Sequence, residues 1–375
     1  MEEAFAEQII PGTYIRVLSE GLISPQGVAA GNIGIVGTAE PLPLPAPEGG
    51  GPAPVATLNT STQILSSLED AQKLFAPSDA ASETSKFNLM RSLELLFRNG
   101  ARTVYARAIA ETTDKSKFTD EMKELLKENV NILVIPELST ADANTELASL
   151  AGTAESEGRD VIAVVGADKQ IPSEITAGAE FKSDKRLILC APAIVAYDRA
   201  SKKDVTLPGR YTAAAVAGLI ASLAAHVSPT NKSLPGVGQI SRKYNYGELK
   251  SLVQGNVLTL ENRGGVRVVR GMTTDGASAA FSQITTRRIV DYAKAGVRQV
   301  TSPFVGKLNN ARVRKAMEGA LDGFLTTMLI DEALTDYTVN VSATRADEIA
   351  GRCVVNISLQ PTFSIDYIRV TLALS

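Results

Sequence analysis

The single histidine and the two cysteines are the residue types in this chain that most often catalyse reactions or bind metals. His226 has no serine–aspartate or cysteine arrangement nearby that would form a catalytic triad. It closes an alanine-rich helix predicted over 211–226, so we interpret it as a capping or packing residue. Cys190 and Cys353 lie far apart, each in an apolar run, without the close spacing of a zinc site. We predict two buried free thiols.

The glycine-rich and charged stretches match no catalytic, nucleotide-binding or metal-binding motif. The sequence has no Gly-x-x-x-x-Gly-Lys-Ser/Thr, no Gly-x-Ser-x-Gly and no Gly-x-Gly-x-x-Gly after a predicted strand. Residues 236–238 and 263–265 are glycine-rich but are predicted to be turns. The stretch 198–204, with Asp198, Lys202, Lys203 and Asp204, is predicted to be a charged, solvated loop. We therefore predict no cofactor and no metal, and an enzymatic function would rest on architecture alone.

Length and charge narrow the class of protein. The chain has 375 residues, enough for two or three hydrophobic cores. Its net charge is -3 and its pI about 5.5, so it lacks the basic surface of a nucleic-acid-binding protein. The first five residues lack the basic and apolar regions of a signal peptide, and no apolar stretch reaches the roughly 20 residues of a membrane helix. We expect a chain folded in a reducing cytoplasm without membrane insertion.

From residue 119 to residue 226, the hydrophobic pattern alternates between helices and unbroken apolar strands. Such strands, separated by helices, are typical of a mainly parallel sheet covered on both faces. Strands are predicted at 32–38, 102–108, 130–135, 160–165 and 186–190. Helices are predicted at 66–75, 85–98, 118–127, 141–155 and 211–226, with Thr140 as an N-cap of the fourth.

The last part of the chain has a different pattern. A long helix is predicted over 311–334, with Val313, Met317, Ala320, Phe324 and Met328 on its apolar face. Three strands are predicted to follow, at 336–342, 352–360 and 365–374. The last strand alternates, with Ile368, Val370 and Leu372 on one face.

The N-terminal residues also alternate, although no core lies near them in the sequence. Ile15 and Val17 form one face of a predicted strand, and Tyr14, Arg16 and Leu18 form the other. Proline and glycine residues on both sides isolate this strand. Because a lone strand is unstable in water, both terminal strands must pair with a distant segment or with another chain.

The order of these segments resembles the tail sheath family of contractile phages, pyocins and related injection systems. The resemblance covers nearly the whole chain and includes Pro11–Arg16, Ile33–Pro41, Leu93–Arg107, the loop Ser228–Lys232, and Gly265–Thr274. The alanine-rich stretch before Ser228, the segment Phe304-Val305-Gly306 and the closing strands also fit. The chain departs from the family in having no tryptophan, and it is shorter than many relatives.

The resemblance implies a mixed α/β (α+β) fold. Its C-terminal sheath assembly domain also receives the N-terminal segment, and an inserted helix–strand domain faces outward. The expected segments are an N-terminal arm at 1–20, an N-terminal sheath segment at 21–110, an inserted α/β domain at 111–235, an assembly domain at 236–362 and a linking strand at 363–375.

The family likeness also implies a structural protein that polymerises and contracts. The expected partners are copies of the same chain in stacked hexameric rings, a tail tube protein, and baseplate and terminator proteins. The expected location is the virion tail, assembled in the bacterial host cytoplasm. Lys307, Arg312, Arg314 and Lys315 are implied to contact the tube; the alternative is a solvated helix end, where basic residues are mildly unfavourable. Another tail component, such as a tube or baseplate subunit, and a cytosolic α/β enzyme of unknown activity remain alternatives.

Overall fold

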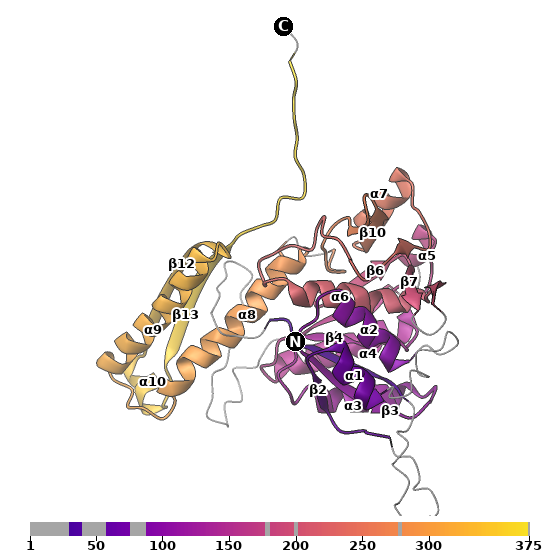
Figure 1. Cartoon of the computed structure of the whole chain (residues 1–375). Helices are drawn as coiled ribbons and strands as arrows, with labels where there is room; N and C mark the ends of the chain where they lie inside the picture. Colours follow the sequence, from indigo (N-terminus) through magenta and orange to yellow (C-terminus); the bar gives the residue numbers. More distant parts are fainter. Residues whose placement is uncertain are drawn as a thin grey trace, which may run out of the picture.

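The computed structural model describes residues 30–39, 58–75, 88–176, 181–198, 202–276 and 280–373. The predicted N-terminal strand Tyr14–Leu18 lies outside these ranges. Two parts are visible in Figure 1: a large sheet with helices on both faces, and a smaller C-terminal unit with the last helices and strands. Among the described residues, no helix is both long and apolar enough to span a membrane.

An eight-stranded sheet forms the centre of the fold. Its order is β11 (Val266–Val268), β10 (Leu258–Asn262), β6 (Leu187–Ala191), β5 (Ile162–Gly166), β4 (Ile132–Val134), β1 (Ile33–Thr38), β3 (Val104–Ile109) and β2 (Gln63–Leu65). The six inner strands are parallel, and the two edge strands pair antiparallel. The predicted, mainly parallel sheet is therefore confirmed.

Alternate residues of the inner strands supply two separate cores. Ile132 and Val134 pack into the core on one face, and Leu133 packs into the core on the other. The first face carries α1 (Leu68–Phe75), α2 (Leu89–Arg98) and α6 (Thr212–Ser222). The second face carries α3 (Lys115–Leu125) and α4 (Thr140–Ser156). Since both faces are covered, strands without polar alternation are stable here.

Three details of the central part differ from the predictions. Ser139, not Thr140, caps α4, because its side chain accepts the amide of Asp142. The helix α6 ends at Ser222, so His226 lies in the turn that follows it and does not close the helix. The predicted charged loop at 198–204 is partly a hairpin, since β7 (Ile194–Asp198) pairs with β8 (Lys203–Thr206). The charges of β8 lie on an exposed edge strand, which hides the strand pattern in the sequence.

Several short elements complete the central part. The strand β9 (Gln239–Ile240) joins β7 and β8 in a three-stranded sheet. The remaining helices are α5 (Pro172–Thr176), the 3-10 turn η2 (Gly209–Tyr211) and α7 (Tyr246–Gln254), which begins with a capping box of Asn245 and Glu248. The glycine-rich stretches 236–238 and 263–265 form turns, as predicted.

The C-terminal unit contains α8 (Ile284–Thr301), η3 (Ser302–Phe304), α9 (Ala311–Ile330), β12 (Leu334–Ser342), α10 (Arg345–Ile349) and β13 (Val354–Pro361). The sequence predicted α9 but missed α8, whose buried side chains include Arg287, Arg288 and Lys294. Ile289, Ala293 and Val297 nevertheless recur at helical spacing and are buried, so the sequence does carry the signal of this helix. The buried face of α9 includes Leu321 and Leu325, whereas Ala320 is exposed, which corrects the predicted face.

The N-terminal strands β1, β2 and β3 lie in the central sheet, next to β4, and not beside β12 and β13. Their apolar side chains need cover on both faces, which the central sheet provides. The described N-terminal chain contacts the C-terminal unit at Ala30, whose carbonyl accepts a hydrogen bond from Arg288 of α8. The expected boundaries at 110 and 235 stay predictions.

Candidate interaction site

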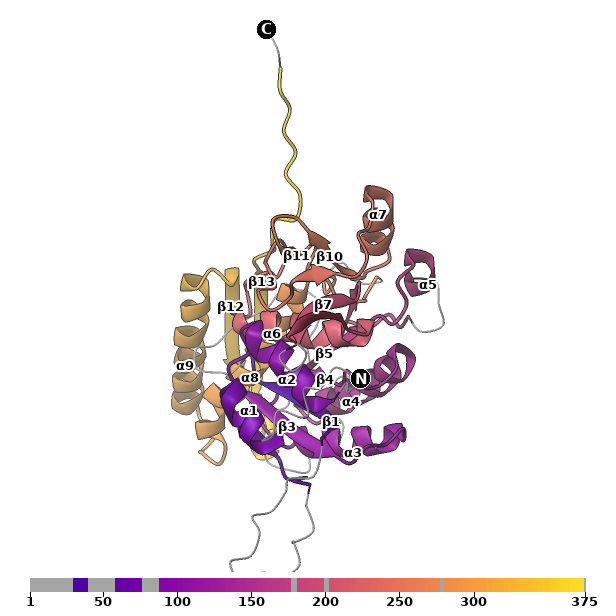
Figure 2. The same cartoon turned by 45° about the vertical axis from the view of Figure 1, so that its right-hand side comes forward.

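The chain beyond β13 leaves the body of the molecule as an extended segment, residues 362–373, which we call the C-terminal arm (Figure 2). A strand was predicted here, and the described residues offer it no strand partner. Ile368, Val370 and Leu372 are 82%, 74% and 86% exposed. A row of exposed apolar side chains marks an interaction surface. The alternation expected from the sequence is therefore present without a partner inside the same chain.

The base of the C-terminal arm is held firmly. The Asp366 carboxylate accepts hydrogen bonds from Arg270 Nε at 2.8 Å and from Gln283 Nε2 at 3.2 Å, and its side chain is only 6% exposed. Thr230 Oγ1 lies 3.4 Å from the other carboxylate oxygen. Two segments that carry the family resemblance, the loop with Thr230 and the chain after β11 with Arg270, thus meet around one arm residue.

The core of the C-terminal unit is incomplete in the isolated chain. Leu321 and Leu325 of α9 are fully buried at its centre. Along the sheet, however, Tyr337, Val339, Val355 and Ile357 are only partly buried against this core. Among the described residues, β12 and β13 pair only with each other, so each has an unpaired outer edge. A further strand from elsewhere would extend the sheet and cover the half-buried residues.

The four basic residues predicted to contact a tube lie at the start of α9, but they differ in their surroundings. Arg312 and Lys315 are exposed, and Lys315 pairs with Glu318 on the same helix. Arg314 is only 16% exposed and pairs with Glu348 at 3.0 Å. Lys307 lies over the ring of Phe304, 4.7 Å from its centroid. The structure brings the four to one end of the helix, with Arg314 committed to an internal ion pair.

The two cysteines are free and differ in burial. Cys190 in β6 is fully buried, as predicted, and burial raises the pKa of its thiol. Cys353 is half-buried at the start of β13, so the prediction of a buried thiol is wrong there. The cause is the thin C-terminal sheet, which covers its apolar face only in part. Burial still raises the pKa of Cys353, which makes it a weak nucleophile.

A buried ionic network that the sequence did not reveal joins α8 to the central sheet. Arg186, just before β6, pairs with Glu155 at 2.6 Å, Asp160 at 2.8 Å and Asp291 at 3.0 Å. From α8, Lys294 and Arg298 reach Asp160 at 2.7 and 2.9 Å. Burial alone would raise the pKa of Glu155, but the hydrogen bond and charge of Arg186 outweigh it and lower that pKa to about 2. The pKa of Asp160 is lowered by Arg186, Lys294 and Arg298 in the same way.

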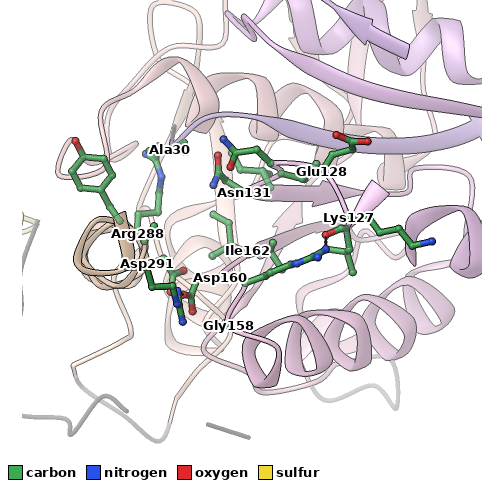
Figure 3. A pocket seen from close by; sticks show the side chains of 18 residues that line it. Ala30, Lys127, Glu128, Asn131, Gly158, Asp160, Ile162, Arg288 and Asp291 are labelled. Atoms are coloured by element: carbon green, nitrogen blue, oxygen red, sulfur yellow. Dashed lines mark hydrogen bonds and ion pairs between the residues drawn. The ribbon is translucent and has the colours of Figure 1, made fainter. Parts of the chain in front are cut away.

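A cavity of about 370 Å³ lies beside this network, between α8 and the amino ends of β1, β4 and β5. Figure 3 shows Arg288 and Asp291 at one side of it, near Ala30 and Asp160. Asp160 is held by three cations, and Arg288 donates to the carbonyls of Ala30, Leu223 and Ala224. Because these groups serve the protein's own contacts, the arrangement fits a structural junction better than a ligand site.

A further buried carboxyl group lies at the other end of the strands, where β1 and β4 finish. Glu137, after β4, accepts hydrogen bonds from the amide of Thr38 at 2.9 and 3.0 Å and from its hydroxyl at 2.6 Å. Burial raises the pKa of Glu137 to about 7. Ligands of α/β sheets often bind at the carboxyl ends of the strands. Here the carboxylate instead fastens the end of β1 to the chain that follows β4.

Comparison with known families identifies the class of protein that this fold and these surfaces define. Residues 111–274 match the phage tail sheath protein central domain, and residues 277–375 match the phage tail sheath C-terminal domain. The chain belongs to the phage tail sheath family. Both matches describe sheath proteins, so a tube component or an α/β enzyme is not favoured, and the family is a structural one.

Individual relatives are distant in sequence but similar in fold. The tail sheath protein of Mycobacterium phage Bxz1 is 24% identical over 80% of this chain and 54% of its own length. The chain thus spans about half the length of that curated relative. The helical sheath of the anti-feeding prophage in its contracted state is 17% identical, with a TM-score of 0.72, and the match covers 98% of this chain and 100% of that one. A crystal structure of the sheath tail protein from Desulfitobacterium hafniense is 14% identical, with a TM-score of 0.62 over 97% and 100% of the two chains.

Proposed function

We propose that this chain is the subunit of a contractile tail sheath, which polymerises helically around a tube and shortens to drive the tube through a target envelope. One observation carries the proposal most directly. The chain combines an exposed apolar arm that has no strand partner in the described residues with a C-terminal sheet that has two unpaired edges and a half-covered core. The sheet edge of one copy could pair with the arm of another, and that arm could cover the exposed part of the core.

The link between subunits would be strand addition. The C-terminal arm of one copy would pair with the edge of β12 or β13 in another, with Ile368, Val370 and Leu372 directed to the half-covered core. Burying each of these side chains stabilises a contact by about 1.5–3 kcal/mol. Backbone hydrogen bonds hold such a strand while the subunits rotate, because no large side-chain interface has to break. The strand Tyr14–Leu18, outside the described residues, is proposed as a second arm.

Linkage of this kind runs head to tail and does not close on itself, so it produces a helical polymer. We propose stacked hexameric rings of this chain, assembled in the bacterial host cytoplasm and incorporated in the tail of the particle. The contracted sheath of the anti-feeding prophage, which shares the fold, supports a polymer that shortens. Baseplate and terminator proteins would cap its two ends.

The tube would meet the start of α9. Arg312 and Lys315 are exposed there, and Lys307 is exposed just before the helix. Exposed cations of this kind govern encounter and register with an acidic surface more than affinity, and salt weakens them. Because Arg314 already pairs with Glu348, the contact would rest mainly on the other three residues.

The test is the assembly of variants without arms. Deletion of 367–375 or of 1–20 should leave a folded monomer that forms no tubes in sedimentation and electron microscopy. Tyr246→Ser, which changes a side chain that is 84% exposed on α7, is the matched control and should assemble normally. Tubes of normal length from either deletion variant would refute linkage through the arm that it lacks.

Tube contact is tested separately. Reversal of Lys307, Arg312 and Lys315 to Glu should give empty sheaths when the variant is produced with its tube protein at low salt. Extended, tube-filled sheaths in normal yield would rule out this contact and leave the arm linkage intact.

A further inference from the structure

The first turn of α8 holds the base of the C-terminal arm. Gln283, the residue before the helix, accepts the amide of Ser364 at 3.1 Å and donates to its carbonyl at 3.3 Å. Its Nε2 group also reaches Asp366, and Thr285 lies 3.4 Å from the Ser364 hydroxyl. Gln283 makes no side-chain capping bond to its own helix. Its side chain is therefore used for the arm.

The contacts between the C-terminal arm and the body of the subunit end within two residues. The buried Asp366 carboxylate bonds Arg270 and Gln283, and the Arg270 guanidinium also lies over the ring of Tyr367, 5.6 Å from its centroid. From Ile368 onward, the arm's side chains are exposed. The direction in which the arm leaves the subunit is thus set by contacts that end at Tyr367.

One turn further along α8, Arg288 holds the chain just before β1. Its guanidinium is buried and donates to the carbonyl of Ala30 at 3.0 Å and to those of Leu223 and Ala224 at 2.9 and 3.1 Å. Ala30 leads directly into β1. Near its start, α8 therefore contacts the base of the C-terminal arm through Gln283 and Thr285, and the chain before β1 through Arg288.

The second half of α8 is fastened to the central sheet. Asp291, Lys294 and Arg298 enter the buried network of Arg186, Glu155 and Asp160. Removing one member of such a network leaves uncompensated buried charge, so its geometry resists change. The helix α8 thus contacts the base of the C-terminal arm and the chain before β1 near its start, and the central sheet along its remaining length.

We propose that α8 is the anchor through which the C-terminal arm transmits force to the body of the subunit, with Asp366 and Gln283 as the residues that position the arm. The inference rests on the proposed function of this arm as a link between subunits. A pull on the arm passes through Gln283 and Thr285 into the helix and, through the ionic network, into the central sheet. The subunit then rotates as one body, and the flexible point is the arm beyond Tyr367.

The test uses full-length Asp366→Ala, which keeps the arm and removes its anchor. Asp120→Ala, at an exposed aspartate of α3, is the control. In the isolated subunit, amide hydrogen exchange at 364–367 should become about tenfold faster in Asp366→Ala and remain unchanged in α9. Sheaths should still form, within about a factor of two of normal yield, since the arm can still pair with a neighbour. After a fixed shear pulse, their mean length should be about one third of that of wild-type sheaths.

Gln283→Ala removes the bonds from α8 to Ser364 and Asp366. It serves as the second variant, so that a folding defect in Asp366→Ala does not decide the outcome. If sheaths of both variants resist shear as well as wild-type sheaths do, the anchor is refuted while the linkage by arms stands. If the variant without residues 367–375 forms normal sheaths, linkage of subunits by this arm itself fails. The two failures are therefore distinguishable.

Discussion

Each inner strand of the central sheet, from β10 to β3, has a hydrogen-bonded neighbour on both sides, whereas β12 and β13 have one neighbour each among the described residues. The side chains differ in the same way. Ile188 in the central sheet is fully buried, but Ile357 in the C-terminal sheet is only partly covered. The comparison indicates that the central part is complete within one chain, while the C-terminal unit is built to be completed by others.

Disruption of the ionic network should give the largest loss of stability in the isolated subunit. It therefore tests whether the central part is complete within one chain. Arg186→Leu leaves Glu155, Asp160 and Asp291 without their shared cation and should lower the free energy of unfolding by about 3–5 kcal/mol. Arg242→Leu, which breaks a half-exposed pair with Glu248, is the control and should change it by less than about 1 kcal/mol. Urea unfolding of the isolated subunit measures both. Equal effects would contradict a buried network.

Two matched truncations compare the two cores directly. Ile188→Ala should destabilise the isolated subunit by about 2–5 kcal/mol, because it leaves a cavity in a closed core. Ile357→Ala should cost only about 1 kcal/mol, because its side chain is already half-hydrated. The same variant should weaken polymer formation. Equal costs in the isolated subunit would show that the C-terminal core is already complete.

The pH dependence of stability tests the contact between Glu137 and Thr38 at the end of β1. Because the folded-state pKa of Glu137 is about 7 against an ordinary value of 4.5, the folded state binds its proton more tightly than the unfolded state. Stability from this group is present at low pH and is lost as pH rises from about 4.5 to above 7, by about 3 kcal/mol. Glu137→Gln should remove that decline, and Glu111→Gln, at an exposed residue, should not. A decline of the same size in Glu137→Gln would assign it to another group.

The arm should have the smallest effect on the subunit by itself. Combined replacement of Ile368, Val370 and Leu372 by Ser should change the free energy of unfolding by less than about 0.5 kcal/mol, since these side chains are exposed. The same replacement should abolish polymers in sedimentation. A clear loss of stability in the monomer would mean that the arm folds back on its own chain.

The sequence predicted the parts of the fold that follow simple hydrophobic periods. Unbroken apolar strands such as Ile132–Val134 need cover on both faces, so the parallel sheet could be inferred before the structure. The helix α8 could have been inferred, because Ile289, Ala293 and Val297 recur at helical spacing. The burial of Arg287, Arg288 and Lys294 in it could not, since most of their partners lie far away in the sequence. Only the pairing of these charges with Asp160, Asp291 and backbone carbonyls makes their burial possible.

For the interaction surfaces, the sequence identified the exposed residues but not the contacts that position them. Alternation identified Ile368, Val370 and Leu372, and their exposure agrees with an unpartnered strand, although their role between subunits stays a prediction. The anchoring of Asp366 by Arg270 and Gln283 could not be predicted, because three distant segments meet there. The basic residues before and in α9 were identified from charge alone, and charge does not reveal that Arg314 is bound to Glu348.

Disulfide trapping between the arm of one copy and the sheet of another tests the central claim most directly. In a Cys353→Ser background, Val370→Cys would be combined in turn with Val339→Cys, Val355→Cys and Ile357→Cys, and Cys190 is buried and does not interfere. Residues on one face of paired strands have Cβ atoms about 4.5–5.5 Å apart, close enough for a disulfide after small movements. Assembled protein should give a ladder of covalently linked chains with at least one pair, and dilute monomer should give none. Assembled tubes without intermolecular cross-links from any of the pairs would contradict linkage of subunits through this arm.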